Sequence, residues 1–263
     1  PNLNILDLSY NDLRMIPADL LQENRRIMIF QMYGIPVDPF PNSLFCDLNT
    51  LYSLNLNGVF KTGTFPLNLF GSDPSQDCDP MHTYSYLGIL RLSLNDFSVI
   101  PNNAFVRVGR IHNELQLAGS RINEIQPDAF QSLTEVQMLC LDDNFISDLP
   151  LTVFQPLTAL GQVTLTNNSL LTLDAAHFAG LDHFEAFDAS HNFITELTGK
   201  WSSVRILFIR AEYNNITIIR NETFSSMPER IILLLEHNQI AVIDPDAFVN
   251  TWFYKLYLGY NNV

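Results

Sequence analysis

The sequence has few basic residues, few cysteines and no long hydrophobic run. Its 14 Lys and Arg residues stand against 28 Asp and Glu, a formal net charge of −14. A chain this acidic, without a basic stripe, is poorly suited to bind the phosphate backbone of nucleic acid or an anionic membrane surface. The longest apolar runs, such as residues 231–235, are far shorter than the roughly 18 residues of a membrane span. We therefore expect no nucleic-acid binding and no direct membrane insertion within these residues.

An internal repeat runs through the 263 residues, of which 47% are apolar. The pattern LxxLxLxxNxL, followed by LPxxxF, is typified by LGILRLSLNDFSVIPNNAF at 87–105 and returns as VQMLCLDDNFISDLPLTVF at 136–154. Units begin at residues 3, 27, 51, 87, 112, 136, 160, 184, 206, 230 and 253, so the intervals are 24, 24, 36, 25, 24, 24, 24, 22, 24 and 23. Such a period indicates a solenoid, because no single repeat can bury its own apolar face.

This pattern resembles that of the leucine-rich-repeat proteins, in the 24-residue typical subclass of animal extracellular proteins. The irregular inserted unit and the short unit at residue 184 are similar to Toll-like receptor ectodomains and secreted insect leucine-rich immune proteins. The resemblance implies an α/β repeat solenoid, a horseshoe with a parallel sheet on its concave face and mostly loops or short helical turns on its convex face. It also implies ligand sensing and dimerisation with a partner.

We expect residues 1–263 to form a single domain of about eleven units. Extracellular members of the family usually carry Cys-rich caps, which this sequence lacks at both ends. We therefore expect both caps to be missing, and the chain to be part of a longer ectodomain or to have lost its caps.

Each template position has a physical role. The LxL core is a strand whose leucines point inward. The template Asn ends the strand, and its amide can satisfy backbone groups in the following turn. Ile35, Val59 and Ser120 interrupt this series in units two, three and five. The Asn positions are Asn11, Asn95, Asn144, Asn168, Asn192, Asn214, Asn238 and Asn261. The residues expected to fill the convex side of the core are Phe105, Phe130, Phe154, Phe178, Phe224 and Phe248.

Unit three carries an insertion at about residues 71–86, rich in loop formers. Cys78 lies in it, and Cys46 occupies the Phe position of the preceding unit, on the same side of the solenoid. A Cys46–Cys78 disulfide is therefore favoured; the alternative is two unpaired thiols, one of them buried. The acidic residues near Cys78 match no metal-ligand spacing, so no metal site is predicted.

Three Asn-x-Ser/Thr sequons predict glycosylation at Asn167, Asn215 and Asn221. Each alone is weak evidence, since sequons also arise by chance in Asn-rich repeats. Together with the repeat subclass and the disulfide they favour an extracellular location, in a secreted protein or the ectodomain of a membrane protein.

The chain lacks the motifs of common catalytic sites, with no Gly-rich phosphate loop, HExxH or GxSxG. Cys140 and His191 suggest a nucleophile and a base, but two repeats separate them, roughly 10 Å at the strand spacing. The sequence therefore predicts a protein that is not an enzyme and needs no cofactor.

The strands of the last four units predict a ligand-binding surface on the concave face. Aromatic residues and Arg around an apolar centre are typical of protein-binding hot spots. His or Tyr before the template Asn is also common filler in this family, and the apolar residues could instead meet a neighbouring chain or a further C-terminal part. The two histidines near the glutamates could give a pH-sensitive contact. The predicted residues are His191, Phe208, Arg210, Glu212, Tyr213, Ile232, Leu234, Glu236, His237, Tyr257 and Tyr260.

These features favour a protein-recognition ectodomain of receptor or innate-immune type, which binds a protein ligand or partner chain. The alternative is a cell-adhesion or matrix scaffold, since small secreted proteoglycans and neuronal adhesion proteins share the repeat. A third reading, an intracellular scaffold, requires that the sequons be chance and all three cysteines be reduced.

Overall fold

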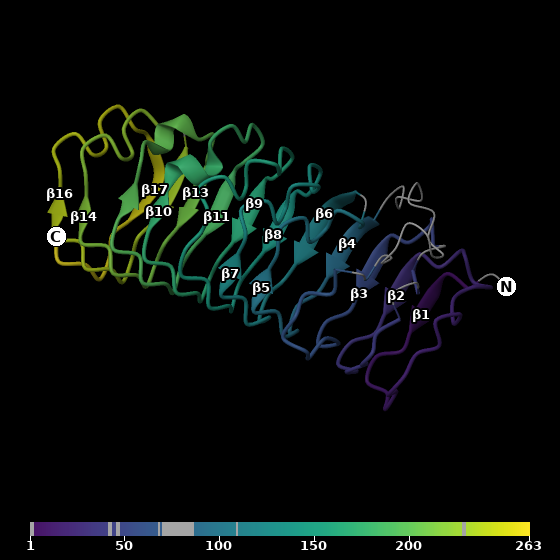
Figure 1. Cartoon of the computed structure of the whole chain (residues 1–263). Coiled ribbons are helices and arrows are strands. Elements are labelled where there is room, and N and C mark those ends of the chain that lie inside the picture. The colour runs from purple at the N-terminus through teal and green to yellow at the C-terminus, as the bar shows by residue number, and fades with distance from the viewer. Residues whose placement is uncertain are drawn as a thin grey trace.

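The computed structural model describes residues 3–41, 44–45, 48–67, 69, 87–108, 110–227 and 230–263. Within them, eleven short strands form one parallel sheet and follow one another in chain order along the solenoid (Figure 1). The fold class predicted from the repeat is confirmed. The strands of this sheet are β1 (Ile5–Asp7), β2 (Ile29–Gln31), β3 (Ser53–Asn55), β4 (Leu87–Arg91), β6 (Ile111–Gln116), β8 (Met138–Cys140), β9 (Gln162–Thr164), β11 (Ala186–Asp188), β13 (Phe208–Arg210), β15 (Ile231–Leu234) and β17 (Phe253–Tyr257).

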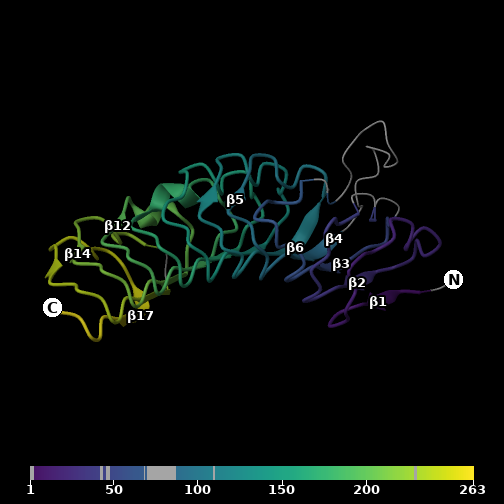
Figure 2. The same cartoon turned by 60° about the horizontal axis from the view of Figure 1, so that its bottom comes forward.

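The other side of the arc carries loops, two short 3-10 helices and three two-stranded pairs, β5–β7, β10–β12 and β14–β16 (Figure 2). The sequence of these units explains the scarcity of helix, because Pro, Asn and Gly interrupt every segment between strands. The minor elements are β5 (Val99–Ile100), β7 (Glu124–Ile125), β10 (Leu173–Asp174), η1 (Ala175–Phe178), β12 (Leu197–Thr198), η2 (Trp201–Ser203), β14 (Ile218–Ile219) and β16 (Val242–Ile243).

The register between neighbouring strands follows the repeat length. Two changes in that length are accommodated by irregular pairing within the strands themselves. Leu87 pairs with Ile111 but Leu90 pairs with Leu115, so β6 accommodates one extra residue as an irregularity in the pairing. A similar shift occurs between β15 and β17. The template leucines of the inner units, such as Leu90, are fully buried, whereas those of the first and last units are partly buried. Stacked units therefore share one core behind the sheet, as a solenoid requires.

Aromatic rings fill the side of the core away from the sheet. Five of the six predicted Phe residues are fully or almost fully buried, and Phe248 is partly buried. Phe178 stacks on Phe184 with ring centroids 4.4 Å apart. In the short unit that follows, the buried Trp201 of η2 takes this place, 5.9 Å from Phe178 and 6.3 Å from Phe224. The template did not predict Trp201, because its position is shifted from that of Phe in the other units.

The template asparagines of the inner units are buried and form the predicted ladder, whereas Asn11 is exposed and Asn261 is half-buried. Asn192 donates from Nδ2 to the carbonyls of Ala189 (3.1 Å) and of Leu165 in the preceding unit (2.9 Å), and its Oδ1 accepts from Leu170 N (2.9 Å). Where Ser120 replaces Asn, its hydroxyl donates to backbone carbonyls instead. At the other two interruptions, Ile35 and Val59, the side chains are buried among apolar residues. Where asparagine is present in the inner units, the ladder therefore ties a turn to the turn before it.

The residue before each template Asn adopts a left-handed backbone conformation. In the last four units these residues have φ of 55° (His191), 53° (Tyr213), 55° (His237) and 56° (Tyr260). Glycine fills the same place at Gly34, Gly58 and Gly119. This conformation is uncommon for residues other than Gly, Asn and Asp. Its recurrence brings the side chains of this column into one file along the edge of the sheet.

Candidate protein-binding surface on the concave face

The structure brings the predicted concave residues together on β13, β15 and β17 and in the turns that follow these strands and β11. Phe208 pairs with Ile232, and Arg210 lies beside Leu234 and, one strand further, Tyr257. Side chains at alternate strand positions point to the same face, so these rows lie side by side outside the core. We call the eleven predicted residues the C-terminal concave patch.

Four aromatic rings of this patch form a continuous stack. The centroids of His191 and Tyr213 are 4.5 Å apart, those of Tyr213 and His237 are 4.2 Å apart, and those of His237 and Tyr260 are 4.1 Å apart. Each neighbouring pair is within 8° of parallel. The outermost ring, Tyr260, is 77% exposed. Stacking fixes these rings in advance, so a partner would lose little conformational entropy by ordering them.

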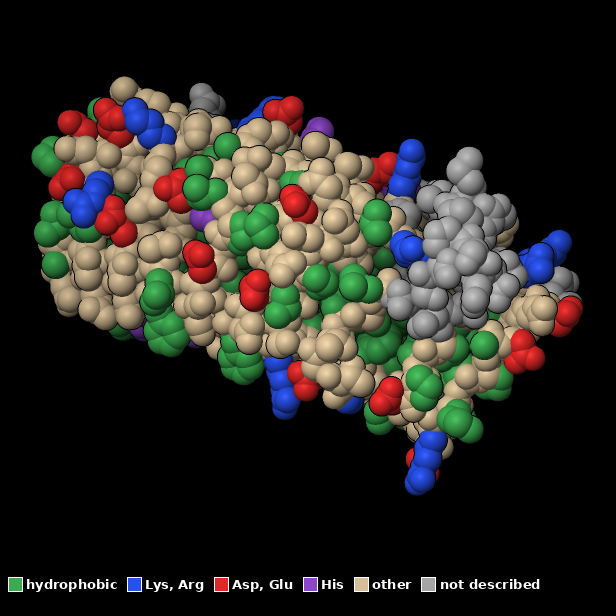
Figure 3. Space-filling view, viewed as in Figure 1, with side chains coloured by type: hydrophobic (Ala, Val, Ile, Leu, Met, Phe, Trp, Pro, Cys, Tyr) green, Lys and Arg blue, Asp and Glu red, His purple; other side chains and the backbone are tan. Residues whose placement is uncertain are grey.

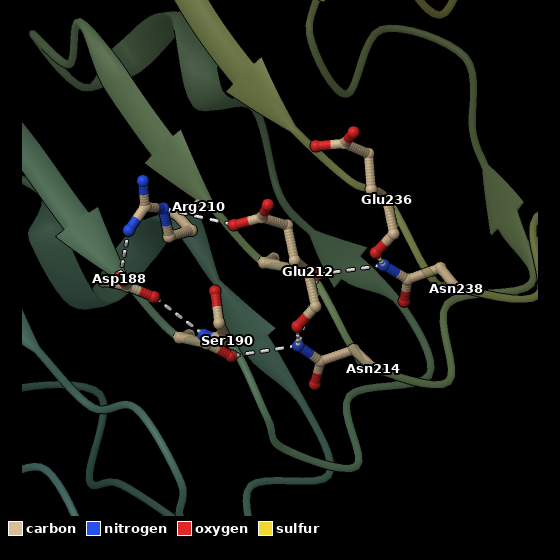
Figure 4. Close-up of polar contacts among 9 residues, drawn as sticks. Asp188, Ser190, Arg210, Glu212, Asn214, Glu236 and Asn238 are labelled. Atoms are coloured by element: carbon tan, nitrogen blue, oxygen red, sulfur yellow. Dashed lines mark hydrogen bonds and ion pairs between the residues drawn. The ribbon is translucent and has the colours of Figure 1, made fainter. Parts of the chain in front are cut away.

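A charged cluster lies beside the aromatic stack. Arg210 Nη1 is 3.3 Å from Asp188 Oδ2, and Arg210 Nε is 3.1 Å from Glu212 Oε2 (Figure 4). The guanidinium also lies over the Phe208 ring, 5.4 Å from its centroid. These contacts hold Arg210 between β11 and the turn after its own strand, β13. Because two carboxylates already neutralise its charge, Arg210 should attract a further anion only weakly.

Glu212 and Glu236 extend side by side from neighbouring turns (Figure 4). Burial raises the pKa of the Glu212 carboxyl above its ordinary value. The positive charge of Arg210 opposes this rise in pKa. The negative charge of Glu236 and a hydrogen bond between the two glutamates increase the rise. The two acidic groups therefore repel each other when both are ionised, and no interaction line reaches the Glu236 carboxylate in Figure 4.

The apolar centre of the patch is less exposed than the sequence predicts. Leu234 is only 8% exposed, and Phe208 and Ile232 are half-buried. The expectation that Leu234 contributes an open apolar surface is therefore wrong, because larger side chains flank it in the same row. The accessible aromatic area comes instead from the tyrosines, of which Tyr257 is 46% exposed.

The three sequon asparagines lie at different places on the solenoid. Asn167 is exposed, continues the aromatic column one strand before His191, and donates from Nδ2 to Asp143 Oδ1 (2.7 Å). Asn215 is half-buried. Asn221 is exposed, and its Oδ1 accepts from Asp246 N.

Of the three cysteines, the structure describes only Cys140. Cys46, Cys78 and the predicted insertion at 71–86 lie outside the described residues. Cys140 is a free thiol whose Sγ donates to Asp142 Oδ2 (3.1 Å). Burial raises the pKa of this thiol to about 11. A thiol of this kind is a poor nucleophile at neutral pH.

A shallow groove that the sequence did not predict crosses the strand starts of the middle units. Its volume is about 480 Å³. Small residues at two positions, Gly161 and Ala186, leave this hollow between polar neighbours. Its lining residues are Asn113, Glu114, Gln137, Met138, Gly161, Gln162, Glu185 and Ala186. Figure 3, which shows the side seen in Figure 1, has exposed hydrophobic side chains in separate groups among acidic and basic ones.

Within the described part of the chain, no cluster of three or more His, Cys, Asp or Glu could hold a metal ion. None of the helices described there is long and apolar enough to cross a bilayer.

Comparisons with known proteins place this geometry among repeat proteins. Family models described as leucine-rich repeat match residues 113–170 and 2–23. Bovine Toll-like receptor 3 is 25% identical over 92% of the chain, which spans 25% of that receptor. The chain spans only 11–25% of the first three curated relatives.

Solved structures with a similar fold support the same grouping. The leucine-rich repeat domain of APL1B superposes with a TM-score of 0.65 at 18% identity, over 98% of this chain and 76% of that domain. A Toll–Spatzle complex, described as a hub in Drosophila development and innate immunity, gives a TM-score of 0.50 at 22% identity, over 94% of this chain and 38% of that one. At these identities the likeness concerns the fold.

Proposed function

We propose that the chain is a recognition ectodomain that binds a protein partner through the C-terminal concave patch. Its leucine-rich-repeat solenoid resembles Toll-like receptors and insect immune leucine-rich-repeat proteins. The observation that carries this proposal is the stack of four rings beside an ion-paired arginine. Pre-ordered aromatic rings next to charged groups are what protein interfaces use as anchors.

Receptor or innate-immune recognition is the form of this function that the similarities favour. One similar structure is itself a complex with a protein, Toll with Spatzle. An adhesion or matrix scaffold would use the same face for a second copy of itself or for a fibrous partner. The identity of the partner would therefore distinguish the two roles, since the same C-terminal concave patch is proposed for both.

A binding experiment with matched tyrosines tests the patch. The purified chain would be screened against a library of extracellular proteins, and any partner measured by surface plasmon resonance. Tyr260→Ala should weaken binding by roughly tenfold or more, as for a hot-spot aromatic. Tyr10→Ala is the control, because Tyr10 has the same left-handed conformation and is 80% exposed at the other end of the solenoid. Equal effects of the two substitutions, or no partner for the wild type, would refute the proposal.

We also propose an extracellular location, with N-linked glycans at the exposed Asn167 and Asn221 and at the less exposed Asn215. Expression through the secretory pathway, followed by N-glycosidase and peptide mass spectrometry, would test each site. A glycan at Asn167 would adjoin His191 and so limit the partner to the units that follow. Unmodified asparagines in the secreted protein would contradict this part of the proposal.

A further inference from the structure

The turn after β17 leaves a gap beside Glu236. Gly259 lies on the concave side between Tyr257 and Tyr260. A Cβ atom built on Gly259 would have, apart from its chain neighbours, only the Cγ and Oε1 atoms of Glu236 within 4 Å, both at 3.8 Å. The missing side chain therefore leaves room for a ligand atom at contact distance from the Glu236 carboxylate.

The charges around this gap are unbalanced. Asp188, Glu212 and Glu236 stand against two basic side chains. Arg210 is ion-paired with the first two acids, and the ammonium group of Lys255 on β17 lies 5.8 Å from the ring centroid of Tyr254. Within the described residues no basic side chain lies within ion-pair distance of Glu236. The chain as a whole carries a net charge of −14. A positively charged group would complement this part of the sheet, and it would also relieve the repulsion between the two glutamates.

Two exposed tyrosines near Gly259 in the chain suit a flat cation. Tyr257 is 46% exposed and Tyr260 is 77% exposed, so a large part of each ring is open to solvent. The inner face of Tyr260 is already covered by His237, with 4.1 Å between centroids, which holds the ring in place. Guanidinium groups stack on aromatic faces and bind carboxylates with two parallel hydrogen bonds, which an ammonium group cannot do.

We propose that the protein partner carries an exposed arginine and that its guanidinium binds over Gly259, against the carboxylate of Glu236 and the rings of Tyr257 and Tyr260. This inference rests on the proposed function, in that it names the chemistry of the partner at the C-terminal concave patch. The occupant is an arginine-bearing protein segment, and the unpartnered face of β15 and β17 is the surface that receives it.

The test uses the whole chain, isotope-labelled for NMR, and two short peptides. One is the blocked peptide Gly-Gly-Arg-Gly-Gly, and the other has citrulline, the neutral isostere, in place of arginine. The arginine peptide should give saturable amide shifts at Gly259 and Tyr260. The citrulline peptide should bind at least roughly fivefold more weakly, because it lacks the charge that pairs with the carboxylate and stacks on the rings.

Three variants locate the binding. Glu236→Gln should weaken the arginine peptide by a similar factor. Gly259→Ala, whose new methyl group meets Glu236 only at ordinary contact distance, should fill the gap and weaken it too. Glu185→Gln removes the same charge from an exposed glutamate at the strand-start side of the sheet, and should leave binding unchanged. Circular dichroism would verify that each variant is folded.

The inference is overturned if the arginine peptide gives no saturable shift, if citrulline binds equally well, or if Glu236→Gln and Glu185→Gln have the same effect. Its failure is distinguishable from that of the proposed function. If a partner binds in a way that depends on Tyr260 but not on Tyr10, and the arginine peptide does not bind, only the arginine inference is refuted. If the arginine peptide binds at Gly259 but no protein partner is sensitive to Tyr260→Ala, only the proposed protein-recognition function is refuted.

Discussion

Replacing one amide of the asparagine ladder should lower stability far more than its size suggests. Asn192 is 4% exposed, and Asn192→Asp changes a single NH2 group to oxygen. Oδ1 can still accept from Leu170 N, but the hydrogen bonds that Nδ2 donates to the carbonyls of Leu165, Ala189 and Ser190 are lost. The substitution therefore isolates the donor half of the ladder and leaves the packing volume unchanged.

The magnitude follows from the number of hydrogen bonds lost. The carbonyl of Leu165 keeps a donor in Asn168 Nδ2, and that of Ala189 keeps one in Asn214 Nδ2. The loss of the two amide hydrogens should therefore cost about 0.5–1.5 kcal/mol each, so the free energy of unfolding should fall by about 1–3 kcal/mol. The new carboxyl group also faces the carbonyl oxygens, which favours its protonated form. Its folded-state pKa is then raised, so the deficit should be largest at neutral pH and shrink as the pH falls through that raised pKa toward the unfolded value.

Urea unfolding followed by circular dichroism would measure this difference at neutral and at mildly acidic pH. Asn250→Asp is the matched control, since Asn250 is exposed and has a φ of 56°, which Asp also tolerates. A loss at neutral pH of less than about 0.5 kcal/mol, which is below the contribution of a single hydrogen bond, would refute the argument. A loss equal to that of the control would do the same.

Three other changes test the core, the charged cluster and the thiol. Phe178→Ala removes a fully buried ring that stacks 4.4 Å from Phe184, and urea unfolding should show a loss of about 3–5 kcal/mol; a loss below about 1 kcal/mol would mean that the site collapses around the gap. Glu236→Gln removes a charge that raises the pKa of Glu212, so an NMR titration should show that pKa fall, and an unchanged pKa would contradict the repulsion described. Cys140, with its pKa at about 11, should resist iodoacetamide at neutral pH in the folded chain and react once unfolded, as peptide mapping would show.

The repeat makes the fold predictable from the amino-acid sequence. A period near 24 residues with leucines at fixed places has one physical solution, a stack of coils that share a core. The template Asn is predicted to satisfy backbone groups of the turn, and the contacts of Asn192 bear this out. Trp201 escapes prediction because the short unit moves the aromatic residue out of its usual place. The core position is filled nonetheless, since an empty one would leave a cavity between Phe178 and Phe224.

The sequence by itself determined the repeat, the parallel sheet and which side chains share the concave face, because these follow from periodicity alone. Only the tertiary structure decided how those side chains contact one another. The stack from His191 to Tyr260 depends on a left-handed backbone repeated in register across four turns. The burial of Leu234 and the gap at Gly259 depend on the neighbours that adjacent strands bring into the same rows. Contacts between units are set by distances across the sheet, which a pattern read along the chain does not contain.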